Sequence, residues 1–336
     1  MGTSVGTVYF SVAVEPATDP AAVSERRVAW PDSQATHTWP IAWLSRAHVY
    51  VEMPVRVEPP ATHGAVGPVS VRVGLDTGSS NPVLTSAGLT RFGVRRPTDS
   101  PRSVSSFNGE AVPAFPVPNK TILDPDVGTG GVGTPVWMHV EGDLYGVDVV
   151  ASPLDLTPQG GAIRLDLARS ELVRCESLAS CLASQHPWSW LEAVSCPDTD
   201  GLLGVRASLG GVRRTLMLDT GGLTLFTGDA GTSQVLKQRA RHLEPGTLVG
   251  ASHAVSAVRA TGAWTLALGR PAIQRTLTQV WIPDAPREGA IARCFPDGSL
   301  GLDALGDCAL VLEDAPKPRA LLRCASDSSE AADERS

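Results

Sequence analysis

The sequence predicts a mainly β protein made of two related lobes with few short helices. Glycine and proline are both abundant, with 33 and 27 copies among 336 residues, which suits many short strands and tight turns. Two alternating apolar runs each end in Asp-Thr-Gly, at Asp76 and at Asp219. The copies lie 143 residues apart (219 − 76), so the second half repeats the first. This length indicates a duplicated lobe, since solenoid repeats span only about 20–50 residues.

The composition excludes several classes of partner. The net charge of −7 argues against nucleic acid or an anionic membrane surface, because both require a basic footprint on the protein. No run of about 18 or more apolar residues occurs, so no membrane-spanning helix is predicted. Residues 1–16 lack the basic and apolar regions of a signal peptide. We therefore expect no nucleic acid partner and no membrane span. We also expect a monomer.

Changes of pattern along the chain divide it into five expected segments. They are an N-terminal extension (1–44), a first lobe (45–176), a linker (177–196), a second lobe (197–325) and a disordered acidic tail (326–336). The extension is expected to be irregular and to be held against a lobe by Trp30, Trp39 and Trp43.

The first lobe begins with a predicted hairpin. Apolar alternation over 48–57 and 68–75 predicts two strands, and the second of them ends at Asp76. The following segment, 83–94, predicts a strand and then a short helix that ends at Gly93.

The second lobe repeats this order. Residues 200–218 predict a hairpin that ends at Asp219, and 232–243 predict a short helix after it. The end of each half is also similar, because 163–175 and 308–324 are strand-like and both finish in Arg-Cys.

A glycine-rich segment, 128–137, formally contains Gly-x-Gly-x-x-Gly. A dinucleotide site would need a strand before this motif and a helix after it. Pro125 and Pro135 flank the motif instead, so a mobile hairpin tip is the better interpretation.

The six cysteines leave two alternatives open. An even number is compatible with disulfides and slightly favours a secreted or periplasmic location, while reduced, partly buried thiols fit equally well. The pairing does not follow from the sequence. The cysteines and the seven histidines lack metal-ligand spacing, so no metal is expected and the histidines are interpreted as structural or exposed.

The Asp-Thr-Gly loops suggest paired carboxyl chemistry. Gly78 allows close approach of the backbone, the Thr77 hydroxyl can reach the partner loop, and Ser79 can donate to the carboxylate. If Asp76 and Asp219 meet, both cannot ionise, and the pair shares one proton. One carboxylate then acts as a general base toward water, and the neutral carboxyl polarises a scissile carbonyl group.

Other candidate residues are less informative. Ser79 and Ser80 lack the Gly-x-Ser-x-Gly context of a serine hydrolase. Asp303 is interpreted as structural, and Trp137 and Phe226 fit a cleft or a core equally well. No cofactor is required by the predicted chemistry.

Asp76-Thr77-Gly78-Ser79-Ser80-Asn81 and Asp219-Thr220-Gly221-Gly222 resemble the two active-site loops of pepsin-like and retropepsin-like aspartic peptidases. The resemblance implies two β-barrel lobes related by a pseudo-twofold axis, with peptide or protein substrate in the cleft between them. Leu300-Gly301-Leu302 resembles the apolar element that packs under such a loop in this superfamily, and 152–156 is a blurred counterpart in the first lobe. Gly130, Gly131, Val132 and Gly133 resemble the glycine-rich flap of retropepsins.

The sequence also departs from the pepsin-like pattern. The spacing between the aspartates is shorter than in typical pepsin-like enzymes, Tyr145 lies too late to match the flap tyrosine, and Gly222 replaces a residue that often carries a hydroxyl group. The resemblance predicts a single-chain aspartic endopeptidase with fused, retropepsin-like lobes. The alternative is a catalytically inactive scaffold of the same fold that binds peptides or glycans.

Overall fold

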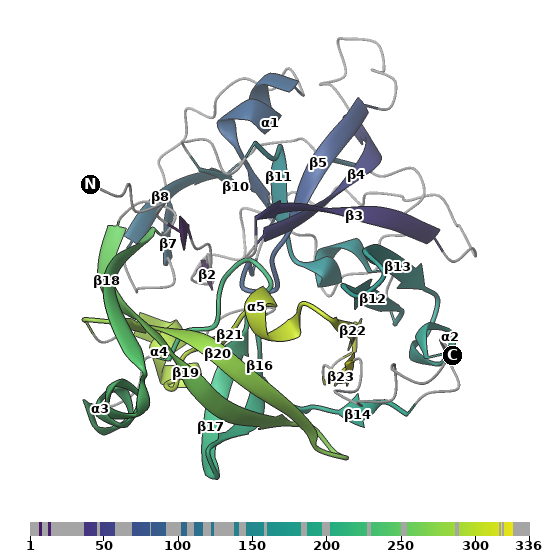
Figure 1. Cartoon of the computed structure of the whole chain (residues 1–336). Helices are drawn as coiled ribbons and strands as arrows, with labels where there is room; N and C mark the ends of the chain where they lie inside the picture. The colour runs from purple at the N-terminus through teal and green to yellow at the C-terminus, as the bar shows by residue number, and fades with distance from the viewer. Residues whose placement is uncertain are drawn as a thin grey trace, which may run out of the picture.

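The computed structural model describes 7–8, 13–14, 37–45, 48–57, 69–80, 82–91, 102–105, 111–116, 122–123, 138–140, 146–157, 160–182, 187–196, 202–226, 230–249, 254–285, 289–315, 317 and 319–324 (Figure 1). Within these ranges the protein is mainly β, as predicted, and its strands form a fifteen-stranded and an eight-stranded sheet with short helices around them. Both sheets are mixed and open, because the path of hydrogen-bonded strands in each runs between two different end strands. The described strands therefore do not form the closed barrels that were expected.

The predicted hairpin of the first half is present. Strand β4 (His48–Val57) pairs antiparallel with β5 (Val69–Leu75), with Val51 opposite Val73. Alternate side chains are buried in the core, at Val49, Val51 and Met53 in β4 and at Val71, Val73 and Leu75 in β5, as expected for strands with one face on the core. Strand β5 ends immediately before Asp76.

Beside this hairpin, β11 (Val149–Ala151) runs parallel to β5 and antiparallel to β6 (Val83–Leu84). The predicted helix follows β6 as α1 (Ser86–Arg91), and η2 (Pro153–Leu156), a 3-10 helix, follows β11. The remaining strands of this region are β2 (Ala13–Val14), β7 (Arg102–Ser105), β8 (Ala111–Pro116), β9 (Ile122–Leu123) and β10 (Met138–Val140). Strand β1 (Thr7–Val8) instead pairs parallel with β18 (His242–Val249) in the eight-stranded sheet.

The second half contains the matching hairpin, β16 (Leu203–Leu209) and β17 (Val212–Leu218), which ends at Asp219. Strand β21 (Ser299–Leu300) runs parallel to β17, and the short helix α5 (Leu302–Leu305) follows it. The predicted helix is α3 (Ala230–Arg239), although the chain already enters β18 at His242. The other elements are β15 (Glu192–Ser195), β18 (His242–Val249), β19 (Ala254–Leu268), β20 (Ile273–Pro283) and α4 (Gly289–Cys294).

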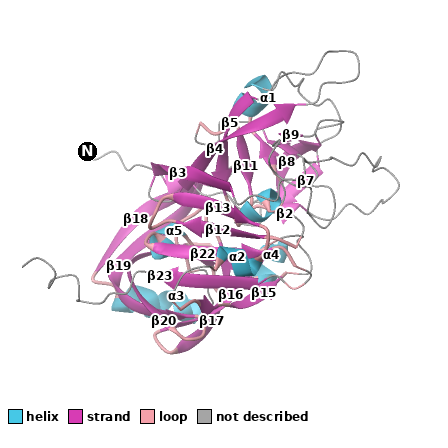
Figure 2. Cartoon of the chain, turned by 90° about the vertical axis from the view of Figure 1, so that its right-hand side faces the viewer, coloured by secondary structure: helices cyan, strands magenta, loops and turns pink. Residues whose placement is uncertain are grey.

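One part of the fifteen-stranded sheet, called the central sheet below, joins the two halves, and Figure 2 shows its strands stacked between them. At its middle, β12 (Ala162–Asp166) pairs antiparallel with β22 (Cys308–Glu313), so that Arg164 lies opposite Val311. Outside this pair lie β13 (Glu171–Cys175) and β3 (His37–Ser45) on one side, and β23 (Arg319–Cys324) and β14 (Ser189–Trp190) on the other. Each hairpin that ends in Arg-Cys therefore lies beside its counterpart from the other half.

Two expectations about segments change. The irregular extension was expected to continue to residue 44, but 37–45 form β3, with Trp39 and Ile41 buried on one face. Pro40 concealed this strand, since proline is depleted in strands. The expected linker, 177–196, contains α2 (Leu178–Cys181), β14 and β15. Trp30 and the tail 326–336 lie outside the described residues.

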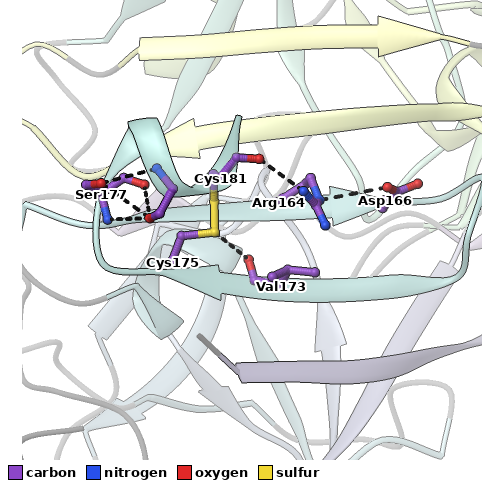
Figure 3. Close-up of a disulfide and its surroundings, with 7 residues drawn as sticks. Arg164, Asp166, Val173, Cys175, Ser177 and Cys181 are labelled. Carbon is purple, nitrogen blue, oxygen red and sulfur yellow. Dashed lines mark hydrogen bonds and ion pairs between the residues drawn. A yellow bond between two sulfur atoms is a disulfide. The ribbon is translucent and has the colours of Figure 1, made fainter. Parts of the chain in front are cut away.

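The structure resolves the choice between thiols and disulfides. Three disulfides are present, Cys175–Cys181, Cys196–Cys294 and Cys308–Cys324. Figure 3 shows that the first joins the end of β13 to α2, where Arg164 donates to the Cys181 carbonyl oxygen at 3.0 Å. The second links residues 98 positions apart and fixes α4 to the segment before β16.

We expect Cys196–Cys294 to contribute most to stability. A Cys196→Ser, Cys294→Ser double variant should lose about 4–5 kcal/mol of unfolding free energy, because this bridge restricts a long segment of the unfolded chain. Removing Cys175–Cys181, whose cysteines are 6 residues apart, should cost about 2 kcal/mol. Urea denaturation of the oxidised proteins measures both losses. Equal losses would contradict this ranking.

Candidate active site

The two Asp-Thr-Gly loops are built in the same way. Asp76 follows β5, and its backbone N–H donates to the Ala151 carbonyl oxygen at 2.9 Å. Asp219 follows β17, and its N–H donates to the Leu300 carbonyl oxygen at 3.0 Å. In each half, the parallel neighbouring strand therefore fixes the point at which the aspartate leaves the sheet.

The threonines of the two loops exchange hydrogen bonds. Thr77 N–H donates to Thr220 Oγ1 at 3.0 Å, and Thr220 N–H donates to Thr77 Oγ1 at 2.9 Å. Each hydroxyl also donates to the opposite half, Thr77 Oγ1 to the Leu218 carbonyl at 2.8 Å and Thr220 Oγ1 to the Leu75 carbonyl at 3.1 Å. All four bonds are buried, so they hold the loops in one relative position.

The aspartates lie side by side inside the protein, with 2% of Asp76 and 0% of Asp219 exposed. Gly78 N–H donates to Asp76 Oδ1 at 2.7 Å, and Gly221 N–H donates to Asp219 Oδ1 at 3.2 Å. Gly221 lies directly against the partner carboxyl, because a Cβ atom there would be 2.3 Å from Asp76 Cγ. The site therefore needs glycine at this position.

Burial raises the pKa of Asp76 well above its ordinary value, and the neighbouring Asp219 raises it further. The N–H groups of Gly78 and Gly221 oppose this rise in the pKa of Asp76, and Asp76 Oδ2 is buried without a hydrogen bond among the described residues. A proton on either carboxyl supplies a hydrogen bond between them. The geometry therefore favours a pair that holds one proton in common.

The other residues predicted for the site lie in the loops, in the core or outside the described residues. Ser79 is buried, and its N–H donates to the Asp76 carbonyl oxygen at 3.1 Å, just as Gly222 N–H donates to that of Asp219 at 3.3 Å. Phe226 is a core residue with no exposed surface. The flap candidate Gly130, Gly131, Val132 and Gly133 lies outside the described residues, as do Asn81 and Trp137.

Sequence reasoning missed the position of His48. This residue is buried, its Nδ1 lies 2.8 Å from Ser45 Oγ, and it lines a small cavity together with Asp76 and Gly221. The register of the β4–β5 hairpin would have predicted this position. Tyr50 pairs with Gly74, so counting two residues along each strand places 48 beside 76.

A second pair of carboxyls, Asp155 and Asp303, is hydrogen-bonded to the segments beside the loops. Asp155, in η2, accepts a hydrogen bond from Ser152 N–H at 2.9 Å, and burial raises its pKa to about 7. Asp303, in α5, accepts from both Thr224 N–H and Thr224 Oγ1 at 2.7 Å, and burial also raises its pKa.

These raised pKa values predict a protein that is more stable in mild acid than at neutral pH. A carboxyl whose folded pKa exceeds its unfolded pKa holds its proton more tightly in the folded state, so stability falls as pH rises between the two values. For Asp155 this range runs from the ordinary 3.8 to about 7. The loss is at most about 4 kcal/mol, and less to the extent that water reaches this partly buried side chain.

Urea denaturation at pH 5 and pH 7.5 should therefore give a larger unfolding free energy at pH 5. In Asp155→Asn the difference between the two pH values should shrink, because the amide does not titrate. An unchanged difference in this variant would show that Asp155 does not contribute.

The described residues offer one cluster with the geometry of a metal site, Asp307 with Cys308 and Cys324. The two cysteines form a disulfide and are not available as ligands. No described helix is long and apolar enough to cross a membrane.

No protein-family model matches this sequence, and no curated protein matches it either.

Proposed function

We propose that this chain is a single-chain aspartic endopeptidase with two pepsin-like or retropepsin-like lobes, and that Asp76 and Asp219 are its catalytic residues. The observation that carries the proposal is the reciprocal pair of Thr77 and Thr220 hydrogen bonds, which hold two buried carboxyls against each other. Such an arrangement costs stability, because two carboxyls are buried together without a cation between them. Acid–base catalysis needs carboxyls with shifted pKa values, so a catalytic role explains why the protein retains this arrangement.

A pseudo-twofold relation between the halves has support from matching elements. Leu75 pairs with Ala151 in one half as Leu218 pairs with Leu300 in the other, and a short helix follows each second strand. The antiparallel pairing of β12 with β22 is also what a twofold axis between equivalent strands would produce.

In the proposed reaction, the ionised carboxylate removes a proton from water while the water oxygen attacks the carbonyl carbon of the scissile peptide bond. The neutral carboxyl gives its proton to the carbonyl oxygen, and the result is a tetrahedral diol. The carboxyl that gained a proton then protonates the leaving nitrogen as the C–N bond breaks, and the other carboxyl, now ionised, takes a proton back from a hydroxyl group of the diol. The products are a carboxylic acid and an amine, and the pair again holds one proton.

The reaction uses only the two carboxyls and water, so the proposed enzyme acts without a cofactor. Peptide or protein substrate would occupy the space between the lobes. The three disulfides are typical of proteins in oxidising compartments and favour a secreted or periplasmic enzyme.

A mixed peptide library, incubated with the protein over a range of pH, tests the proposal. We expect cleavage that a statine-type transition-state mimic inhibits, because the mimic's hydroxyl group takes the place of the attacking water. Peptide or glycan binding without cleavage at any pH would instead indicate the inactive scaffold. Cleavage that the mimic does not affect would contradict the aspartate mechanism.

A further inference from the structure

We infer that Asp155 and Asp303 are positioning residues, each of which holds one catalytic loop through a single peptide group. This inference rests on the proposed function. It assigns to these carboxyls a role in orienting Asp76 and Asp219 without contact to substrate.

In the first half, the peptide group between Ala151 and Ser152 is held from both sides. Its carbonyl oxygen accepts from Asp76 N–H at 2.9 Å, and its N–H donates to Asp155 Oδ2 at 2.9 Å. Hydrogen bonds in a chain polarise one another, so the bond to Asp155 strengthens the bond to Asp76. The Asp155 carboxyl therefore acts on the catalytic loop across one peptide plane.

The second half contains the same arrangement with one added group. The peptide between Leu300 and Gly301 accepts from Asp219 N–H at 3.0 Å and donates to Thr224 Oγ1 at 3.1 Å. The Thr224 hydroxyl in turn donates to Asp303 Oδ1 at 2.7 Å. A hydroxyl can accept and donate at once, so Thr224 relays the contact that Asp155 makes directly.

Neither carboxyl has an ion-pair partner among the described residues. Helix η2 lies against β12 and β22, whose inward side chains, such as Ile163 and Leu310, are apolar. The charged residues of these strands, Arg164, Asp166 and Glu313, alternate with the apolar ones and lie on the other face of the sheet. Asp155 also completes the capping box of η2, and both carboxyls hold their hydrogen-bond partners without a cation beside them.

Substitutions that remove the hydrogen bond are paired with substitutions that keep it. Thr224→Val removes the hydroxyl at nearly constant volume, and Thr224→Ser retains it. Asp155→Ala removes the acceptor, and Asp155→Asn retains an oxygen that can accept from Ser152 N–H. Asp166→Asn serves as the control, because Asp166 is a buried carboxyl on the far face of the central sheet, where it pairs with Arg164 and Arg323.

At a temperature where every variant is folded, Thr224→Val and Asp155→Ala should lower kcat about 10-fold with KM unchanged, because small displacements of a catalytic group reduce the rate without weakening substrate binding. Thr224→Ser, Asp155→Asn and Asp166→Asn should stay within about 2-fold of the wild type. A carboxyl-carbon NMR titration of the Asp76 and Asp219 side chains gives a second readout without substrate. The titration should shift in Thr224→Val and Asp155→Ala and stay unchanged in the other three variants.

Failure of this inference and failure of the proposed function give different results. Unchanged kcat and unchanged titrations in Thr224→Val and Asp155→Ala would overturn the positioning role, whether or not the protein cleaves peptides. A wild type that cleaves no peptide, but whose Asp76 and Asp219 titrations shift in these two variants, would retain the positioning role and refute the peptidase. Equal effects of Asp166→Asn would show that the losses are structural and would also overturn the inference.

Discussion

Replacing Asp76 with Asn is expected to abolish peptide cleavage and to stabilise the fold at neutral pH. The kcat should fall at least about 10⁴-fold, as when one member of a catalytic unit is removed, because the amide can neither share the proton nor act as a base. The unfolding free energy should rise at pH 7, since burial and Asp219 raise the pKa of Asp76 and the wild type must bear that cost. This gain should disappear as pH falls toward the ordinary pKa of 3.8.

Steady-state kinetics and urea denaturation on the same samples test both effects. Asp148→Asn is the matched control, because Asp148 is also buried in the first half but pairs with Arg91 at 2.8 Å and accepts from Arg72 N–H at 3.0 Å. This control should lose stability and keep kcat. Asp219→Asn should reproduce the loss of activity. An Asp76→Asn protein that keeps its kcat within 10-fold would contradict the proposed function.

Adding one methyl group at Gly221 is expected to have the next largest effect. The new Cβ would lie 2.3 Å from Asp76 Cγ and 2.5 Å from both of its carboxyl oxygens. Real atoms do not approach so closely, so Gly221→Ala must displace the Asp76 carboxyl. A displacement of about 1 Å costs about 100-fold in rate, and we expect a loss in kcat of at least that size.

Gly74→Ala is the control for this prediction. It adds the same methyl group two residues before Asp76, where the nearest atom, Val147 Cγ2, is 3.4 Å away and the contact is ordinary. The control should keep kcat near that of the wild type. A similar kcat in Gly221→Ala and Gly74→Ala would show that Asp76 is not confined by the opposite loop.

Local pattern was sufficient for part of this fold. The hairpins before Asp76 and Asp219 could be predicted because alternate burial leaves a period of two in the sequence. The short helices after the loops followed from the same kind of local evidence. Strand β3 could not be predicted in this way, because Pro40 interrupts its pattern; it is held by pairing with β4 and by long-range pairing with β13.

The candidate site was likewise predictable from local sequence only in part. The two Asp-Thr-Gly loops could be predicted because each is a short motif at the end of a strand. The contacts of Asp155 and Thr224 depend on how turns fold back onto the strands, and no periodicity in the sequence reports such a turn. His48 was interpreted as structural or exposed, and only the hairpin register reveals that it lies beside Asp76.

The central sheet has a consequence for synthesis of the chain. Strand β12 is complete at Asp166, but its partner β22 begins at Cys308, 142 residues later (308 − 166). At about 5–20 residues per second, a ribosome needs about 7–28 s to deliver the partner. During this interval one edge of β12 has no native strand beside it, and unpaired edges promote association between chains. The nascent first half should therefore be the stage at which neighbouring copies are most prone to aggregate, and a pause in translation between the two halves should lower the yield of folded protein.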